Sequence, residues 1–266
     1  MVVTSHRKRR RSIEAEWAWY LLSALYLAET HIAFLWPPCQ SITMAPFNFP
    51  NQGSHGVLVY SGGMDSTTLL HECKDTITLC VTFNYGSKHN QRELVCAQDN
   101  CRSLGIRHQT VALPFVNELF RSDLLISGGA IPEGYYSKEN IKSTVVPFRN
   151  GIMLSIAAGL AESNTLSFVM LANHKSDREV YPDCRPSFIE AMHLAIFEGS
   201  DRAVSLLAPY TNLDKREIAV RARALGVDLS RSWSCYKGGE VHCGTCSTCL
   251  ERKRALEGFD TTSYGE

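Results

Sequence analysis

The chain has 266 residues, of which 44% are hydrophobic, and this is enough for one good-sized globular domain or two small ones. Its 27 lysines and arginines balance 27 aspartates and glutamates, which argues against a nucleic-acid coat protein and against direct binding of tRNA. Four of the ten cysteines lie between residues 235 and 249, and the rest are scattered. One tight cluster in a long chain favours a metal site in a reducing compartment over the disulfide framework of a secreted protein.

Residues 1–52 differ from the rest of the chain. A basic run at 7–11 precedes an almost wholly apolar stretch at 17–28, and several prolines follow. This order matches the outline of a signal peptide, although the apolar stretch is too short for a membrane span. Alternatively, the true start is Met44 and the upstream residues are a leader or an unstructured extension. We favour the second explanation, because a thiolate cluster belongs in a reducing cytoplasm.

The next segment predicts an anion site. A strand at 56–60 leads into the turn Ser61-Gly62-Gly63-Met64-Asp65-Ser66, and a helix begins near residue 67. Adjacent glycines let successive N–H groups converge on one point at the positive end of the helix dipole, so a phosphate or pyrophosphate is the expected ligand. No lysine follows the glycines, so this is not a Walker loop. Asp65 instead predicts a Mg²⁺ ion shared with the phosphates; a turn without a ligand is the alternative.

Strand-like and helix-like segments alternate through the rest of the chain. Further strands are predicted at 76–83, 107–113, 166–171 and 204–207, and helices at 90–104, 152–162, 186–198 and 215–225. This alternation predicts an α/β fold, an open parallel five-stranded Rossmann-like sheet with helices on both faces. In such sheets the ligand lies beyond the carboxyl ends of the strands, where the loops at Ser61, Asn84 and Ala172 meet. The weakly patterned stretch 114–147 is expected to be a lid or binding loop, with disorder as the alternative.

The cysteine cluster has the spacing Cys235-x7-Cys243-x2-Cys246-x2-Cys249. Four thiolates at short spacing suit tetrahedral Zn²⁺, and four protein ligands leave no position open for water. The metal is therefore expected to hold the C-terminal segment in place. The rival interpretation makes one or two of these cysteines redox or sulfur-transfer residues. His242 is an alternative ligand that four cysteines make unnecessary.

Polar side chains near two further strands are candidates for ligand binding. Arg149 has the planar fork that suits a carboxylate or phosphate, and Asn150 can read a heterocycle edge or cap the helix that begins there. An ordinary helix start with a surface arginine is the alternative. Tyr85, His89 and Glu93 follow the second strand, and the last two share a helix face. Either these residues lie near a ligand, or His89 and Glu93 form a pair on the surface that satisfies its own hydrogen bonds.

The loop after the fourth strand is more polar than a connector requires. It contains Asn173-His174-Lys175-Ser176-Asp177 and Tyr181-Pro182-Asp183-Cys184-Arg185-Pro186. Asp177 or Asp183 can accept hydrogen bonds from a guanine-like edge, and Lys175 or Arg185 can neutralise a carboxylate or phosphate. A salt-bridged surface loop is the alternative for each of these residues.

These motifs together resemble a known family. The Ser61 turn after a strand is similar to the pyrophosphate loop of the ATP-pyrophosphatase (PP-loop) superfamily, whose members cleave ATP between the α and β phosphates and transfer AMP to an oxygen. Across residues 56–259 the chain resembles the 7-cyano-7-deazaguanine (preQ0) synthase family. The segments that carry the resemblance are 61–68, Tyr85-Gly86 with His89 and Glu93, 146–150, 181–186, 234–236, and Cys243-Gly244-x-Cys246-x-x-Cys249 with Arg252. Ser87 stands where similar sequences tend to have glutamine, and residues 1–52 have no counterpart.

The resemblance implies a ligase that forms carbon–nitrogen bonds. Such an enzyme converts 7-carboxy-7-deazaguanine and ammonia to 7-cyano-7-deazaguanine in queuosine biosynthesis, through adenylated intermediates. The cofactors that it implies are ATP, Mg²⁺ and Zn²⁺, and similar enzymes tend to be homodimers. We therefore expect a cytoplasmic protein whose partners are small molecules, without direct contact with nucleic acid or membranes.

The resemblance also assigns residues to roles. ATP is expected at Tyr60, Ser61, Gly62, Gly63, Met64, Asp65, Ser66 and Thr67, with Asp65 at the Mg²⁺ ion. The expected catalytic residues are Asp65, Arg149, Lys175 and Arg185. The expected substrate-binding residues are Arg149, Asn150, Asp177, Asp183 and Arg185. The expected zinc ligands are Cys235, Cys243, Cys246 and Cys249, and no side chain is required as a covalent nucleophile.

Two alternatives use the same turn. A tRNA-modifying ligase or thiolase would need an RNA-binding domain or a basic face, and the sequence predicts neither. A non-catalytic module would bind the nucleotide without turnover, and a zinc-held interaction protein would leave the Ser61 turn unexplained.

On the main interpretation the chain has an N-terminal extension at 1–52, an ATP-binding domain at 53–228, and a zinc-binding segment at 229–266 packed on that domain.

Overall fold

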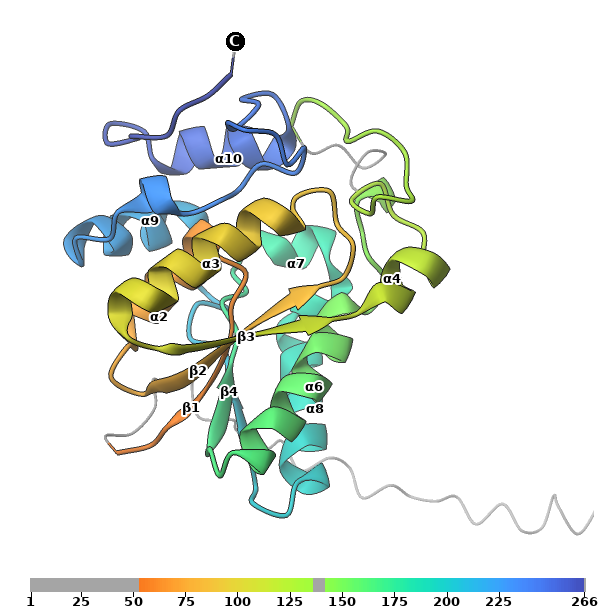
Figure 1. The fold of residues 1–266 in the computed structure, drawn as a ribbon, viewed down its shortest axis with the longest axis vertical. Coiled ribbons are helices and arrows are strands. Elements are labelled where there is room, and N and C mark those ends of the chain that lie inside the picture. The colour runs from red at the N-terminus through yellow and green to blue at the C-terminus, as the bar shows by residue number, and fades with distance from the viewer. Residues whose placement is uncertain (1–52, 136–141, 266) are drawn as a thin grey trace, which may run out of the picture. The chain divides into compact units, whose positions relative to one another are not determined.

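The computed structural model describes residues 53–135 and 142–265, and expectations for residues 1–52 lie outside this range. Its centre is a sheet of five strands in the order β3-β2-β1-β4-β5, with every neighbouring pair parallel (Figure 1). The strands are β1 (Gly56–Val59), β2 (Ile77–Asn84), β3 (Arg107–Ala112), β4 (Phe168–Met170) and β5 (Ser205–Leu207). This confirms the predicted α/β fold class, and each predicted strand is present.

Helices cover both faces of the sheet, as expected. On one face lie α2 (Met64–Glu72), α3 (Asn90–Leu104) and α9 (Lys215–Ala224), and on the other lie α6 (Arg149–Ser163) and α8 (Pro186–Gly199) (Figure 1). Successive side chains of β1 point to opposite faces, so Val57 packs in one hydrophobic cluster with Leu154 of α6, and Leu58 in another with Leu69 of α2. Because both faces are buried at the centre of the sheet, β1 and β4 are wholly apolar, whereas the edge strand β3 is mainly polar and largely exposed.

The shorter helices were not predicted from the sequence. They are α4 (Pro114–Leu119), α7 (Asp177–Val180), α10 (Ser247–Ala255) and the 3-10 helices η1 (Pro182–Cys184) and η2 (Leu229–Arg231). Part of the expected lid, residues 136–141, lies outside the described chain. Within the described ranges, no helix is both long enough and apolar enough to cross a membrane.

The strand order sets the place of the site. The chain runs outward from β1 through β2 to β3, and then crosses to β4 and β5 on the other side of β1. The connections after β1 and β4 therefore leave the sheet in opposite directions and open a crevice at the carboxyl ends of these strands.

The C-terminal segment returns to this crevice. The N–H of Trp233 donates to the carbonyl oxygen of Gly62 at 3.0 Å. The fully buried guanidinium of Arg252 donates to the hydroxyls of Ser232 and Ser234, both at 3.0 Å, and to the carbonyl oxygen of Leu229 at 2.6 Å. These bonds hold the segment against the phosphate turn, while the division of the chain at residue 228 stays a prediction.

Candidate active site

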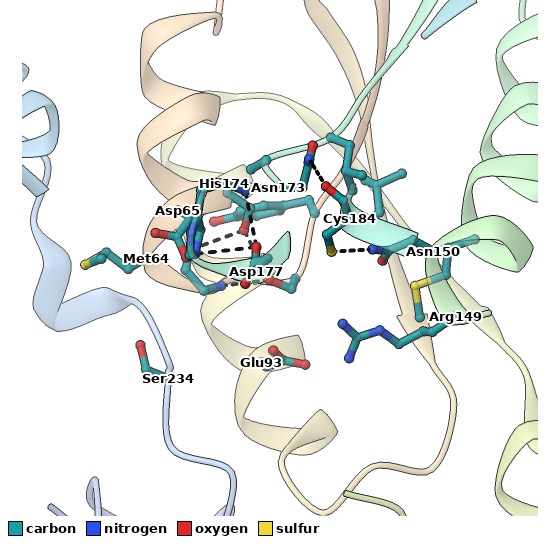
Figure 2. Close-up of a pocket in the computed structure, with 18 of the residues that line it drawn as sticks. Met64, Asp65, Glu93, Arg149, Asn150, Asn173, His174, Asp177, Cys184 and Ser234 are labelled. Carbon is teal, nitrogen blue, oxygen red and sulfur yellow. Dashed lines mark hydrogen bonds and ion pairs between the residues drawn. The ribbon is translucent and has the colours of Figure 1, made fainter. Parts of the chain in front are cut away.

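A cavity of about 220 Å³ lies at the carboxyl ends of the central strands, where the sequence predicts the ligand. Its wall comes from the loops after β1, β2 and β4, and from the first turns of α2, α3, α6 and α9. Trp233, Ser234 and Tyr236 complete it. Figure 2 shows 18 of the residues that line it. Segments far apart in the sequence therefore contribute to one site.

The Ser61 turn and the start of α2 form one wall. Gly62 has φ +80°, and a Cβ there would lie 2.5 Å from the carbonyl oxygen of Glu93, so only glycine fits. The Ser61 hydroxyl accepts from the N–H of Gly63 at 3.1 Å and lies 3.2 Å from the Ser66 hydroxyl. No side chain caps α2. The first turn of this helix thus faces the cavity with the donors and dipole that an anion requires.

Asp65 is the acid of this wall, and its side chain is 20% exposed. Its Oδ2 lies 3.4 Å from Nζ of Lys215 and 3.6 Å from Nε2 of His174, whereas its buried Oδ1 has no hydrogen-bond partner among the described residues. Burial opposes ionisation, but Lys215 and His174 outweigh it and keep the pKa of Asp65 below its ordinary value. A charged carboxylate with one unsatisfied oxygen beside an anion site fits a Mg²⁺ ion, which takes oxygen ligands.

Lys215 is a cation of this site that the sequence analysis missed. It is the first residue of α9, and the Asp214 carboxylate accepts from the N–H of Glu217 at 2.8 Å in a capping box that fixes the start of this helix. Its Nζ lies between Asp65 and Glu251, at 3.4 and 3.6 Å. These carboxylates raise the pKa of Lys215 above its ordinary value despite burial.

The two cations that were expected in this role lie elsewhere. Lys175 and Arg185 are exposed and do not line the cavity. The only sequence signal for Lys215 is that its helix follows the predicted fifth strand, which places the helix start at the same edge of the sheet as the Ser61 turn. This signal does not show which cation at that edge reaches Asp65.

The expected substrate-binding acids also differ in position. Asp177 lines the cavity, and its carboxylate accepts from the N–H of His174 at 3.2 Å. Asp183 is buried outside the cavity lining, and its Oδ2 accepts from the N–H of Asn150 at 2.7 Å. It therefore caps the start of α6. Asn150 lines the cavity and donates its amide to the carbonyl oxygen of Asp183 at 3.2 Å and to Sγ of Cys184 at 3.1 Å.

Arg149 projects into the cavity among aromatic rings. Its Nη1 donates to the Tyr85 hydroxyl at 3.3 Å, and its guanidinium carbon lies 5.8 Å from the ring centroids of both Tyr85 and Tyr181. The Tyr181 and Tyr236 hydroxyls are 3.0 Å apart. The positive charge of Arg149 is thus stabilised by aromatic faces and a hydroxyl, and the guanidinium group remains directed into the cavity (Figure 2).

His89 and Glu93 line the cavity and are not a surface pair. His89 is 3% exposed, and burial together with Arg149 lowers its pKa to about 3, so the imidazole is neutral at pH 7. The 3.7 Å contact between Nε2 of His89 and Oε2 of Glu93 therefore provides no countercharge. Burial raises the pKa of Glu93 to about 8, and Arg149 only partly opposes this shift.

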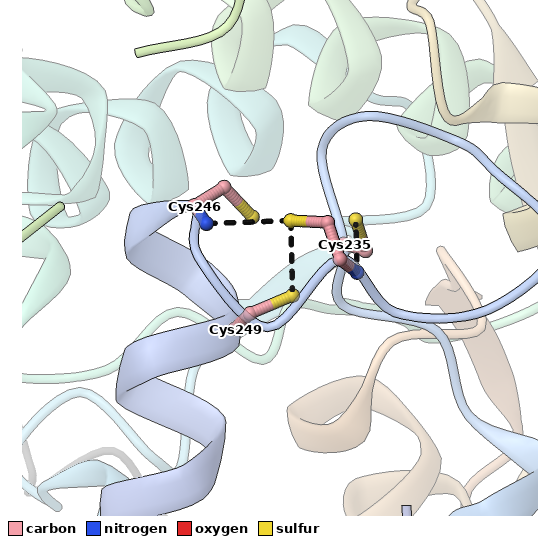
Figure 3. Close-up of side chains that lie close together, drawn as sticks. Cys235, Cys246 and Cys249 are labelled. Carbon is pink, nitrogen blue, oxygen red and sulfur yellow. Dashed lines mark hydrogen bonds between the residues drawn. The ribbon is translucent and has the colours of Figure 1, made fainter. Parts of the chain in front are cut away.

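The four clustered cysteines form a separate group beside the cavity. Their sulfur atoms all lie within 4.8 Å of one another, and those of Cys243 and Cys249 are 3.9 Å apart. A tetrahedral ion with metal–sulfur distances of about 2.3 Å needs sulfurs about 3.8 Å apart, so the group fits a metal ion. Figure 3 shows the thiols of Cys235, Cys246 and Cys249 close together.

Neighbours of the cluster connect it to the cavity. Ser234 and Tyr236, on either side of Cys235, line the cavity. Nε2 of His242 accepts from the N–H of Ser234 at 3.1 Å, and His242 is not part of the group that could hold a metal. A metal at the cysteines would therefore also fix part of the cavity wall.

Comparison with known proteins identifies the family. The family model for queuosine biosynthesis protein QueC matches residues 55–260. The chain belongs to the QueC family. The 7-cyano-7-deazaguanine synthase of Porphyromonas gingivalis is 54% identical over 211 residues, which cover 78% of this chain and 96% of that protein. The synthases of Desulfotalea psychrophila and Methanoregula boonei are 49% and 43% identical, over 78% and 75% of this chain and 97% and 93% of those proteins.

The raised pKa of Glu93 predicts a pH-dependent loss of stability. Between the unfolded pKa of 4.5 and the folded pKa of about 8, only the folded chain holds this proton, so the free energy of unfolding falls as pH rises. The variant Glu93→Gln has no such proton and does not lose this stability. As the pH rises through this range, the free energy of unfolding of the variant should increase relative to that of the original chain by up to about 1.4 kcal/mol per pH unit. Urea unfolding at several pH values measures it. Equal pH profiles for the two proteins would contradict a buried neutral Glu93.

Proposed function

We propose that this chain is a 7-cyano-7-deazaguanine synthase, which uses ATP to convert 7-carboxy-7-deazaguanine and ammonia to the nitrile. Membership of the QueC family supports this function. The observation that carries it is a single cavity with the Ser61 turn, Asp65 and Lys215 at one end and Arg149 with Glu93 at another. Such a cavity suits a nucleotide triphosphate and a polar heterocycle together.

The phosphate end would bind ATP through the chain's own donors. The N–H groups of the first turn of α2, with the hydroxyls of Ser61 and Ser66, would receive the pyrophosphate. Lys215 would neutralise phosphate charge as pyrophosphate leaves. The free oxygen of Asp65 is the proposed ligand of Mg²⁺, which when bound neutralises further phosphate charge.

The reaction then needs positioning more than a reactive side chain. The substrate carboxylate attacks the α-phosphate and releases pyrophosphate, ammonia displaces AMP, and an amide and a proton result. The amide oxygen then attacks the α-phosphate of a second ATP and releases pyrophosphate, and loss of AMP and of both amide N–H protons leaves the nitrile. The chain's contribution is to hold the carboxylate in line with the α-phosphate and to exclude water from the adenylate.

We further propose that the four cysteines hold Zn²⁺ with a structural role. Residues 131–135 support this role, because Glu133 forms a β-bridge with Cys246, and the N–H of Gly134 donates to the carbonyl oxygen of Thr245 at 2.9 Å. The ion would tie this loop and residues 233–236 together. A cytoplasmic homodimer acting on small molecules, as the family resemblance implies, fits this function.

The function is tested by mass spectrometry of the product. The purified chain with ATP, Mg²⁺, ammonium and 7-carboxy-7-deazaguanine should yield the nitrile, with AMP and pyrophosphate released for each activation. Without ammonium no amide or nitrile should form. Consumption of ATP without any change in the heterocycle would exclude the proposed function.

The paired variants Lys215→Met and Lys175→Met test the cation of the phosphate end. Removing a buried group that stabilises developing charge costs about 100- to 1,000-fold in kcat, so Lys215→Met should lose activity on this scale. Lys175 is exposed outside the cavity, and Lys175→Met should retain nearly full activity. Steady-state pyrophosphate release measures both. A larger loss from Lys175→Met would contradict this account and favour the expectation from the sequence.

The zinc proposal predicts a metal content of about one Zn²⁺ per chain by plasma mass spectrometry. Cys246→Ser removes one of four ligands and should lower both this content and the midpoint of thermal unfolding. Cys96→Ser is the matched control, because Cys96 lies outside the cluster and should leave the zinc content unchanged. Iron in place of zinc, or full zinc content in Cys246→Ser, would rule out the proposed site.

A further inference from the structure

Glu93 and Arg149 face one another in the cavity, apart from the group around Asp65 (Figure 2). Glu93 comes from α3 and Arg149 from the first turn of α6, so their positions are set by separate elements. The guanidinium is a fixed donor fork, and the carboxylate is a pure acceptor when it is charged. Together they present donor and acceptor atoms side by side.

The carboxyl group of Glu93 needs hydrogen-bond donors. Its side chain is 15% exposed, and the neighbouring His89 is neutral, so the contact between them does not compensate the charge. Desolvation raises the pKa of Glu93 to about 8. A ligand that offers N–H groups to both carboxylate oxygens would replace the lost water and favour the charged form.

The backbone beneath Glu93 is firmly held. The carbonyl oxygen of Glu93 lies so close to Gly62 that a Cβ on Gly62 would meet it at 2.5 Å. This close approach places the backbone of Glu93 directly against the phosphate turn. A heterocycle bound at Glu93 would therefore lie close to the ATP phosphates.

The pairing edge of guanine matches this arrangement. It presents one acceptor, O6, followed by two donors, N1–H and the exocyclic amino group, so Arg149 would donate to O6 while Glu93 accepts from the two donors. An adenine edge presents an N1 lone pair, which the carboxylate would repel. The end near Glu93 thus separates the substrate heterocycle from the adenine of ATP. The rings of Tyr85 and Tyr181 beside Arg149 are apolar surfaces for such a base.

We propose that Glu93, beside Arg149, selects a guanine-like heterocycle by accepting hydrogen bonds from its N1–H and exocyclic amino groups. The inference rests on the proposed function and names the specificity residue of that site. Glu93 takes the role that the sequence analysis considered for Asp177 or Asp183. Asp183 caps α6 outside the cavity lining, and Asp177 lies with His174 and Asp65.

The test compares two substrates in Glu93→Gln. One is 7-carboxy-7-deazaguanine, and the other is the analogue that lacks the exocyclic amino group. Glutamine keeps one acceptor oxygen but turns an NH₂ group toward a substrate donor. We expect kcat/KM for the guanine-like substrate to fall about 10- to 100-fold, while the analogue changes little, so that selectivity is lost. Asp99→Asn, on the same helix with a side chain 45% exposed, is the control and should keep the original selectivity.

Binding of the free bases separates this inference from the proposed function. Calorimetry with 7-deazaguanine and 7-deazahypoxanthine needs no turnover, and the original chain should prefer 7-deazaguanine while Glu93→Gln should not. If the chain prefers 7-deazaguanine but makes no nitrile, the proposed function is wrong while the inference about Glu93 still holds. If turnover occurs but Glu93→Gln weakens both bases and both substrates by the same factor, Glu93 is only structural and the inference is wrong.

Discussion

The close approach of Gly62 to its neighbours is the constraint on which the site depends. The turn lies directly against the backbone of α3 at Glu93, and its carbonyl oxygen accepts from the N–H of Trp233 at 3.0 Å. A side chain at Gly62 would push the turn away from α3. One glycine thus joins the phosphate turn, the helix that carries Glu93 and the segment that leads to Cys235.

Buried charge is distributed differently at the two ends of the cavity. Asp65 and Lys215 compensate one another, so both stay charged and the free oxygen of Asp65 is available to a cation. Arg149 has aromatic partners, and Glu93 has a neutral histidine beside it. The first end is therefore prepared for phosphate and metal, whereas the second is completed only by a ligand with its own donors and acceptors.

Features set by local sequence could be predicted. The strands, the long helices, the Ser61 turn and the cysteine cluster follow from apolar runs, glycine pairs and ligand spacing. Helix α10 was missed because its sequence is mainly polar and has no apolar stripe. Helix α4 was missed because its six residues are too short for a periodic pattern.

Roles that depend on contacts between distant elements could not be predicted. Lys215 lies beside Asp65 only because α9 starts at the same sheet edge as the phosphate turn, and the capping role of Asp183 depends on where α6 begins. The sequence left open whether His89 and Glu93 lie near a ligand or form a surface pair, because burial is a tertiary property. The choice between Lys175 and Lys215 likewise required the fold.

A crystal structure of the chain with 7-carboxy-7-deazaguanine and a non-hydrolysable ATP analogue would test the central claim most directly. The account predicts the β and γ phosphates at the Ser61 turn near Lys215, a metal ion on Asp65, and the pairing edge of the deazaguanine against Glu93 and Arg149. A heterocycle bound outside the cavity, or phosphates that do not contact the Ser61 turn, would contradict it.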